Sequence, residues 1–346
     1  IGMKNSGTAA NPVQITGDPE QPYTGASLAR RSGASKAVVL DLSRAGGVRI
    51  ESLIVSNAYR GISVSNNSTL VMEHVRVRDC YGGQAVYVQG SSVDAAYSIF
   101  EQSLTGVMVS TGAVVTIRHS LLRDNFFANL YMEGNSASGT IKNSILDASG
   151  SSKFIYYLDG SGNLSADYNN VRARDGAHVA GGIGRISDRF LIDWQISTGF
   201  IQDKNSVGCD PLFANAAALD FHLKSEYGRY DPVMESWRLD SETSKLIDLG
   251  DPASSYGNEP APDGGRVNIG LFGNTVEASM SPGQGTLVPL TMSDGGTIRG
   301  TNAMLYWSYN GVASNERVHV EFSGDGGGTW TNIATVYADQ GSIGQP

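Results

Sequence analysis

Two stretches of the chain, VMEHVRVRDC (residues 71–80) and TIRHSLLRDN (residues 116–125), share the pattern that decides the fold. In each stretch an apolar residue, a charged residue and a histidine follow one another, and an Arg-Asp pair comes four residues after the histidine. Asp79 and Asp124, which end the two pairs, are 45 residues apart. Recurrence at a fixed distance is the signature of a repeat architecture, so this interval sets the alignment of the rest of the chain.

Related segments fill this interval and extend beyond it at steps of 21 to 26 residues. Each step holds two short runs of alternating apolar residues separated by Gly, Ser and Asn, which is typical of β-strands bounded by turns. The step is too short for a propeller blade and shows no helical periodicity. It fits one coil of a solenoid, in which each strand pairs with its equivalent in the next coil. The first ladder comprises residues 50–55, 72–77, 95–100, 117–122, 141–146 and 166–171, and the second 61–64, 85–88, 106–109, 129–132 and 155–158.

This repeat, with its I-x-N-S-I-L form at residues 141–146, resembles that of the right-handed parallel β-helix proteins of the pectate-lyase-like superfamily. The resemblance covers roughly residues 10–275. It implies an all-β fold, in which a right-handed parallel β-helix of 21–26 residues per coil is followed by a small β-sandwich-like module. The same fold hosts lyases, hydrolases, adhesins and structural proteins, so function has to be argued from individual residues.

The chain is predicted to have two domains and a linker. Residues 1–278 form the parallel β-helix, with a closing or cap segment from about residue 175, and SMSPGQG (residues 279–285) is the linker. Residues 286–346 alternate as antiparallel strands and resemble an immunoglobulin-like module. Such a module usually needs about 100 residues, so this one is expected to be incomplete or to continue beyond Pro346.

The closing segment carries its own expectations. It resembles the segment that forms the last coils and a cap in large secreted bacterial β-helix proteins. RFLIDWQISTG (residues 189–199) is predicted to be a short helix, and the polar stretch at residues 224–244 is expected to loop out. In the tail, SGDGGGTW (residues 323–330) fits the Asp-box pattern of sialidases once, and is predicted to be a hairpin turn in which Asp325 binds local amides and Trp330 packs underneath.

Composition excludes several classes of function. The net charge of −9 and the pI near 5.0 disfavour nucleic acid as a partner, because phosphate binding needs a basic face. The sequence has no run of about 18 apolar residues that would predict a membrane span, and no signal peptide, so we expect a processed chain or a segment of a longer one. It contains no HExxH, P-loop or nucleophile-elbow motif, and no cofactor is expected. Cys80 and Cys209 are expected to be free or buried thiols.

The two histidines of the opening pattern occupy one position of the coil. His74 and His119 are two coils apart, with Tyr97 between them, so about 10 Å separates them at the strand spacing of a β-sheet. Ligands of a single zinc ion lie about 2 Å from the metal, which excludes a shared zinc. We therefore predict a stack of side chains at a corner and no metal site. Asp248, Asp251 and Asp263 are likewise assigned to turns, because they lack the spacing of a calcium loop.

The Arg-Asp pairs belong to a column whose charges alternate from coil to coil. Opposite charges on neighbouring strands stabilise a sheet. Lyases of the superfamily typically need an Arg or Lys poised as a base, often near acidic calcium ligands, and a column with cancelling charges is unsuited to that role. We therefore predict a structural ladder and no catalytic residue. The column comprises Ser56, Arg78, Glu101, Arg123 and Asp147.

The second ladder predicts a binding surface. Its apolar residues should point inward, so the residues between them should form an exposed aromatic and thioether stripe. Exposed apolar patches mark contact surfaces, and Tyr is favoured at interfaces. The alternatives are that a loop covers the stripe or that it only stabilises the sheet. The predicted binding residues are Tyr87, Met108, Tyr131 and Tyr157, with Ser63 in the same column.

Three functions remain open. The favoured one is a non-catalytic extracellular structural or adhesive surface protein of bacteria, a subunit of a larger assembly or filament, with other protein subunits or surface glycans as partners. The first alternative is a polysaccharide lyase or other carbohydrate-active enzyme, which the superfamily resemblance implies. It would need a basic groove, for which Arg172 and Arg174 beside His178 are the nearest candidates. The second is a carbohydrate-binding module that uses the tyrosine stripe.

Overall fold

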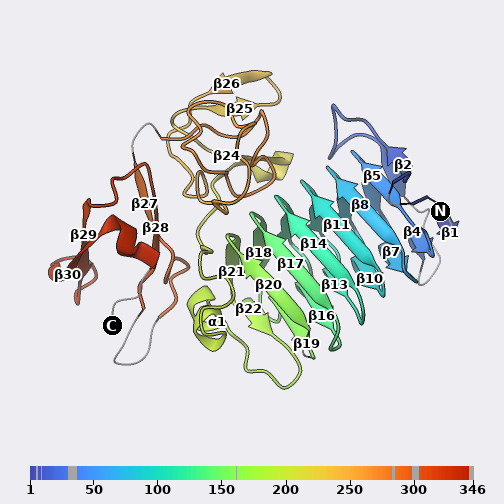
Figure 1. Cartoon of the computed structure of the whole chain (residues 1–346), viewed down its shortest axis with the longest axis horizontal. Coiled ribbons are helices and arrows are strands. Elements are labelled where there is room, and N and C mark those ends of the chain that lie inside the picture. Colours follow the sequence, from blue (N-terminus) through green and yellow to red (C-terminus); the bar gives the residue numbers. More distant parts are fainter. Residues whose placement is uncertain are drawn as a thin grey trace.

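The computed structural model describes residues 1–4, 7–8, 10–29, 37–160, 162–282, 285–297 and 304–342. In this described part, the strands up to residue 181 wind into a right-handed parallel β-solenoid of about six turns (Figure 1). Each turn contributes one strand to each of three parallel sheets, which are called sheets A, B and C. The solenoid expected from the sequence is confirmed.

The described strands of each sheet run in coil order. Sheet A is β1 (Gly2–Lys4), β4 (Val38–Ser43), β7 (Arg60–Ser65), β10 (Gln84–Gln89), β13 (Thr105–Val109), β16 (Ala128–Glu133), β19 (Phe154–Asp159) and β22 (His178–Gly181). Sheet B is β2 (Val13–Thr16), β5 (Val48–Glu51), β8 (Thr69–Glu73), β11 (Ser92–Ala96), β14 (Val114–Arg118), β17 (Ser138–Lys142) and β20 (Asn163–Asp167). Sheet C is β3 (Ser27–Ala29), β6 (Ile54–Ser56), β9 (Arg76–Arg78), β12 (Ile99–Glu101), β15 (Leu121–Arg123), β18 (Ile145–Ser149) and β21 (Asn170–Arg174).

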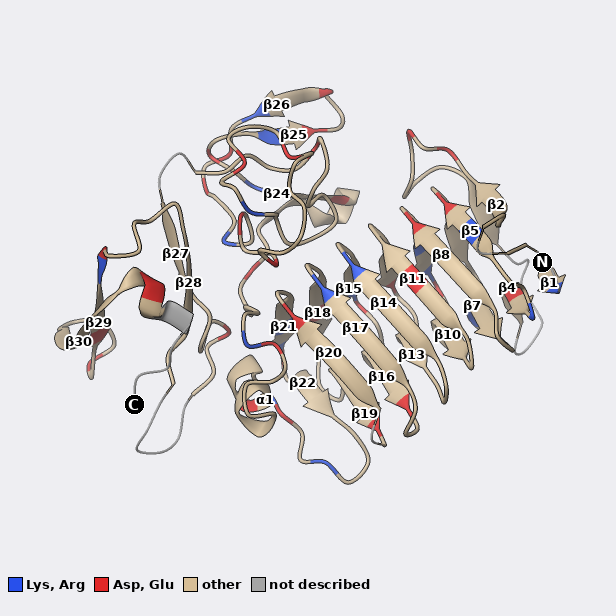
Figure 2. Ribbon diagram, in the orientation of Figure 1, with Lys and Arg blue, Asp and Glu red and all other residues tan. Residues whose placement is uncertain are grey.

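Apolar columns fill the interior because equivalent residues pair in register from coil to coil. In sheet A, Ile62, Val86 and Val107 are paired in this way, and each is at most 2% exposed. Alternation along a strand sends the neighbouring residues outward. Charged residues lie mainly at the strand ends and corners, while the strands themselves are mostly uncharged (Figure 2).

The histidine column forms the predicted stack at the corner between sheets B and C. The rings of His74 and Tyr97 are stacked with centroids 5.1 Å apart, and those of Tyr97 and His119 with centroids 5.4 Å apart. These residues, like Asn143 in the next coil, have positive φ between 46° and 53°. Left-handed backbone is costly for residues other than Gly, so each turn depends on the stacking of its neighbours.

One end of the solenoid is closed by a helix. RFLIDWQISTG contains α1 (Leu191–Ser197), as the sequence predicted. Its Trp194 is 1% exposed and packs on Tyr156 of the last coils, with ring centroids 5.8 Å apart. The indole Nε1 donates a hydrogen bond of 3.0 Å to the buried carboxylate of Asp203. The helix therefore separates this end of the core from solvent.

Residues 206–280, called the flanking segment, begin with a single parallel bridge between Val207 and Asn170 of β21, and a role as a closing or cap segment remains a prediction. They pack along the outer face of sheet C, where Ile99, Leu121 and Ile145 share one hydrophobic cluster with apolar residues of the segment. An apolar column on an outer face needs a cover, which explains why the segment folds back along the solenoid. Its elements are β23 (Phe213–Asn215), η1 (Ala216–Ala218), β24 (Asp220–Leu223), β25 (Arg229–Asp231) and β26 (Ser236–Arg238), of which β25 and β26 form a hairpin within the polar stretch.

The C-terminal region contains antiparallel pairs, as predicted. β27 (Thr286–Pro289) pairs with β28 (Trp307–Asn310), β29 (Arg317–Phe322) pairs with β30 (Thr331–Tyr337), and η2 (Ala338–Ser342) follows. An immunoglobulin-like module remains a prediction. So does the linker, whose residues 283–284 lie outside the described part and whose Ser281 is fully buried by the flanking segment.

The turn predicted for the tail is present, but its tryptophan is more exposed than expected. Asp325 accepts hydrogen bonds from the Thr329 amide and the Ser323 hydroxyl, as expected, and these bonds lower its pKa to about 2. Trp330 lies beside Gly327 of the turn, but it is 60% exposed and so is not buried beneath it. These hydrogen bonds of Asp325 are both made to residues of the turn itself. Trp330 immediately precedes β30, which pairs with β29 in a two-stranded sheet. Cys80 and Cys209 are free thiols, as expected.

Candidate functional site

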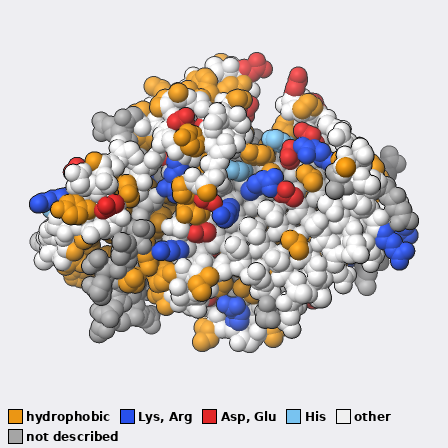
Figure 3. Space-filling model, viewed as in Figure 1, with side chains coloured by type: hydrophobic (Ala, Val, Ile, Leu, Met, Phe, Trp, Pro, Cys, Tyr) orange, Lys and Arg blue, Asp and Glu red, His pale blue; other side chains and the backbone are white. Residues whose placement is uncertain are grey.

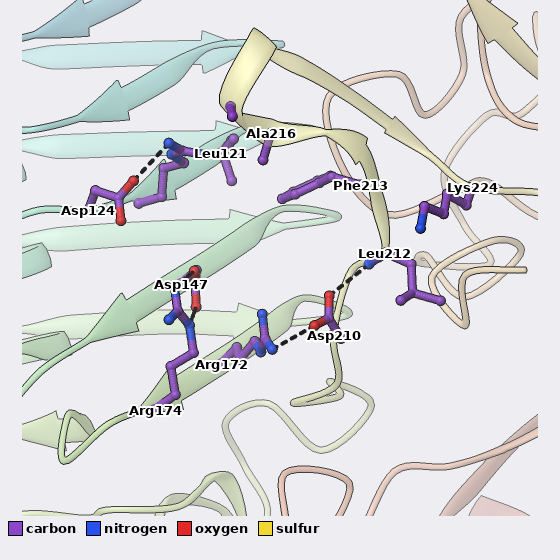
Figure 4. A pocket seen from close by; sticks show the side chains of 12 residues that line it. Leu121, Asp124, Asp147, Arg172, Arg174, Asp210, Leu212, Phe213, Ala216 and Lys224 are labelled. Atoms are coloured by element: carbon purple, nitrogen blue, oxygen red, sulfur yellow. Dashed lines mark hydrogen bonds and ion pairs between the residues drawn. The ribbon is translucent and has the colours of Figure 1, made fainter. Parts of the chain in front are cut away.

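A cleft of about 560 Å³ lies between the outer face of sheet C and the flanking segment (Figure 4). Its volume is within the range of small-ligand pockets. The flanking segment forms one wall and strands β15, β18 and β21 form the other. The sheet contributes Leu121, Arg123, Asp124, Asp147, Arg172 and Arg174, and the flanking segment Asp210, Leu212, Phe213, Ala216, Ala217 and Lys224.

The register of the solenoid brings the charged side chains of this cleft together. Arg123 pairs with Asp147 on the next strand, and Asp147 pairs with Arg172 on the strand after that. Arg123 and Asp147 occupy one column, as the sequence alignment predicted, and Arg172 extends that column by one coil. The cleft itself was not predicted, because its second wall comes from the flanking segment.

Arg172 and Arg174 are both held by carboxylates. Arg174 Nε and Nη2 donate hydrogen bonds to the two oxygens of Asp147, at 3.1 Å and 2.9 Å. These bonds raise the pKa of Arg174 above its usual value, so the guanidinium stays protonated. Arg172 Nη2 contacts Asp210 Oδ2 at 2.8 Å, and Asp210 Oδ1 accepts a bond of 3.0 Å from the Leu212 amide.

The remaining cations of the cleft are paired in the same way. Arg123 lies 3.1 Å from the Oε2 of Glu101 and 2.8 Å from the Oδ2 of Asp124. Glu101 is fully buried and also accepts a hydrogen bond of 2.7 Å from Arg76 Nε. Lys224 Nζ contacts Glu242 at 2.8 Å. The cleft therefore presents cations and carboxylates side by side.

The partner of Glu101 differs from the prediction. Arg78 is opposite Ser56 in the expected register, but the buried ion pair of Glu101 is with Arg76 and Arg123. Arg76 also points outward, and it is buried because its Nη1 donates to the carbonyl of Tyr23 in the covering N-terminal loop. Arg78 stays partly exposed and contacts Asp79 at 3.4 Å. Among the described residues, Glu101 is therefore paired with Arg123 of its own column and with Arg76, which lies opposite Ile99 in the neighbouring column.

His178 does not join Arg172 and Arg174. It lies on β22 of sheet A, where its ring stacks on Phe154 with centroids 5.4 Å apart. On the face shown in Figure 3, several Lys and Arg side chains lie beside Asp or Glu side chains. The basic groove suggested by the sequence is therefore reduced to the two arginines of the cleft, and both are paired.

The tyrosine stripe forms the predicted column on sheet A. Tyr87 pairs with Met108, Met108 with Tyr131, and Tyr131 with Tyr157. The tyrosines are half-buried, whereas Met108 is only 8% exposed and Ser63 is buried. Met108 was expected to be exposed; it is buried because two longer tyrosine side chains flank it in register. A binding role for Tyr87, Met108, Tyr131 and Tyr157 remains a prediction.

Phenylalanines that the sequence analysis did not include enlarge this column. The ring centroids of Phe127 and Phe154 lie 4.7 Å and 5.2 Å from that of Tyr157, and Tyr131 packs edge-on to Tyr157 at 5.0 Å. Phe127 immediately precedes β16. An aromatic residue directly before a strand of the second ladder was the sequence signal that could have predicted its place beside the tyrosines. Burial, together with the nearby Asp159, raises the pKa of Tyr131 to about 12.

Metal ligands do not gather in the part of the chain that is described: it contains no group of three or more His, Cys, Asp or Glu side chains able to hold an ion. Asp251 contacts Lys142 Nζ at 2.7 Å, Asp248 accepts a bond from Ser281, and Asp263 accepts one from the Gly265 amide. Asp251 also accepts a bond of 3.0 Å from the Ala253 amide, so Asp251 and Asp263 have turn partners, whereas the partner of Asp248 is distant in the sequence.

No helix within the described residues has the length and apolar character needed to cross a membrane.

A match to a protein-family model supports the fold. Residues 31–177 match the family model described as the right handed beta helix region. No curated protein matches the chain. Among solved structures, the chain is similar to the crystal structure of pectate lyase Pel9A, with 12% sequence identity, a TM-score of 0.38, and coverage of 79% of this chain and 82% of that one. Similarity at that level carries no information on activity.

Proposed function

We propose that this chain is a non-catalytic structural or adhesive protein, located outside the cell or on a bacterial cell surface. The observation that supports this most is the pairing of Arg123, Arg172, Arg174 and Lys224 with carboxylates around the cleft. A general base has to give up its own proton before it can accept one. A guanidinium or ammonium held by a carboxylate stays protonated, so the cleft is suited to binding and unsuited to proton abstraction.

The test of this proposal is a lyase assay. Pectate, alginate and chondroitin are each incubated with the protein, and the absorbance of unsaturated products is followed. We expect no rise above the rate of a heat-inactivated sample. A rise that Arg78→Ala or Arg123→Ala abolishes would refute the proposal.

The adhesive contact is assigned to the aromatic column of sheet A, with surface glycans as partners. Aromatic rings offer apolar faces, and the tyrosine hydroxyls stand beside polar side chains: Tyr87 donates to Gln89 at 3.1 Å. On a glycan array, Tyr131→Ala is expected to lose signal. Tyr227→Ala, at a 43% exposed tyrosine of the flanking segment, is the matched control and should bind as the wild type does. Equal binding by both variants would show that the aromatic column of sheet A is not the glycan-binding surface.

Assembly into larger structures is proposed to use the same surface. Edge strands invite pairing with other chains, but α1 covers one end of the solenoid, so end-to-end stacking through that end is disfavoured. Side-by-side contact through sheet A is left as the route. Light scattering at high concentration should then show a larger mass that Tyr87→Ala and Tyr131→Ala reduce. A monomer at every concentration contradicts a filament.

A polysaccharide lyase is the second candidate, and the specific observation in its favour is the gathering of arginines in one cleft. It would require one of them to leave its carboxylate when substrate binds. Asp147→Asn frees Arg174 without changing the shape of the side chain, and lyase activity that appears in this variant would favour the second candidate.

A further inference from the structure

We infer that the cleft beside sheet C binds a neutral, hydroxyl-rich ligand, a sugar unit of one or two rings. This inference rests on the proposed function, because it takes the cleft to bind its ligand without chemical change. It adds a second contact surface to the aromatic column of sheet A, and it names the class of ligand.

The cleft has an apolar part and a polar part. Figure 4 shows Phe213 and Ala216 on one side, next to the buried Leu121, and Asp147, Arg172 and Asp210 on the other. A pyranose ring has the same division, with C–H groups on its faces and hydroxyls around its edge. Pockets for small ligands combine apolar walls with a few polar groups that fix orientation.

The polar part offers donors and acceptors next to one another. Arg172 lines the cleft, and among the residues that the structure describes its guanidinium is bonded to Asp210 through a single nitrogen, which leaves further N–H groups for a ligand. Asp124 is bound by Arg123 through Oδ2, and its Oδ1 has no bond to another described residue. A sugar hydroxyl both donates and accepts, so adjacent hydroxyls match this arrangement.

Charge selects against ionised ligands. The carboxylate of an acidic sugar would come close to Asp124, Asp147 and Asp210, and an amine would come close to the arginines. Displacing a carboxylate from Arg174 would break a bidentate pair, which is among the stronger charge-assisted contacts. A neutral ligand leaves every ion pair intact.

The walls are already in place before a ligand arrives. Glu101 is buried between Arg76 and Arg123, and Asp147 is fixed by two bonds to Arg174. Phe213 packs edge-on to Phe221 with ring centroids 5.3 Å apart. Binding therefore orders few side chains, which lowers its entropic cost.

The test is calorimetric titration of the full chain with cellobiose, maltose and mannobiose as neutral probes and digalacturonate as the acidic probe. We expect at least one neutral disaccharide to bind and digalacturonate to bind at least tenfold more weakly. Phe213→Ala and Arg172→Ala should each weaken binding about tenfold. Arg118→Ala is the matched control, because Arg118 forms an exposed ion pair with Asp94 on sheet B, outside the cleft, and it should bind as the wild type does.

A further variant distinguishes a loss of binding from a loss of folding. Ala217 is exposed at the rim of the cleft, so Ala217→Phe should fill the cleft, leave the melting temperature unchanged and abolish binding. The inference is overturned if none of the neutral probes binds, if digalacturonate binds more tightly, or if Ala217→Phe leaves binding intact while Tyr131→Ala removes it. The last outcome moves the ligand to sheet A and leaves the proposed function standing. Unsaturated products from digalacturonate would instead overturn the proposed function.

Discussion

Sheets A and C belong to the same coils, yet their outer faces differ in kind. The outer face of sheet A carries half-buried aromatic rings that pack on one another, and those rings remain accessible. The outer face of sheet C carries the apolar column Ile99, Leu121 and Ile145, which is fully covered by the flanking segment. The difference shows that a regular solenoid acquires a cleft where a non-repeating segment has to cover an apolar column, and that the cleft forms at the edge of this cover.

The largest effect is expected under the cover, at the buried carboxylate of sheet C. Glu101→Gln keeps the shape of the side chain but leaves the buried Arg76 without its counter-charge and Arg123 with Asp124 alone. Breaking one partner of a buried pair should lower the free energy of unfolding by about 3–5 kcal/mol, measured by urea denaturation. Asp94→Asn, in the exposed pair with Arg118, should cost less than about 1 kcal/mol. Equal costs would mean that Glu101 is not buried in solution.

The apolar column beneath the flanking segment should be nearly as sensitive. Ile99 is 0% exposed, so Ile99→Ala should cost about 2–5 kcal/mol through lost burial and the cavity it leaves. Val114 on sheet B is 52% exposed, and Val114→Ala should stay within about 0.5 kcal/mol. If Ile99→Ala were as mild as Val114→Ala in the same denaturation experiment, the flanking segment would not cover sheet C.

At the corner between sheets B and C, covering by the flanking segment should make stability depend on pH. Burial beneath the flanking segment lowers the pKa of His119 to about 4, whereas His74 in the same column is only half-buried. The unfolded chain protonates this histidine near pH 6.5 and the folded chain only near pH 4. Its contribution to stability is therefore lost as the pH falls from 6.5 to 4, by at most about 3 kcal/mol.

His119→Asn should remove this pH dependence. Asn is already used at the equivalent position 143, so the left-handed turn tolerates it. The measurement is the difference in unfolding free energy between wild type and variant at a series of pH values, which cancels the other titrating groups. His74→Asn is the control and should flatten the curve less. Identical curves for the two variants would show that the flanking segment does not shield His119.

The smallest effect is expected on the uncovered face. Arg60 lies 3.9 Å above the ring of Tyr87, a cation–π contact at a half-buried site. Tyr87→Ala should cost about 1 kcal/mol, and Tyr227→Ala in the flanking segment still less. A loss above about 3 kcal/mol for Tyr87→Ala in thermal denaturation would mean that sheet A is covered as sheet C is.

The sequence was sufficient to predict features that follow from the repeat itself. The period predicted the coil, the strands, the stack of His74, Tyr97 and His119, and the column that contains Tyr87 and Tyr131, because in-register pairing makes each position a column. What it missed depends on contacts between distant segments. The cleft needs Phe213 against sheet C, the pairing of Glu101 with Arg76 needs the covering loop, and neither contact leaves a periodic signal.

The central claim is that the arginines of the cleft are committed to their carboxylates, and a double-mutant cycle on Arg174 and Asp147 tests it most directly. The free energy of unfolding is measured for the wild type, Arg174→Ala, Asp147→Ala and the double variant. Side chains in one ion-pair network should show a coupling energy of about 1 kcal/mol, against a value close to zero for the exposed pair of Arg118 and Asp94. Zero coupling between Arg174 and Asp147 would contradict the account, because Arg174 would then be free to take part in chemistry.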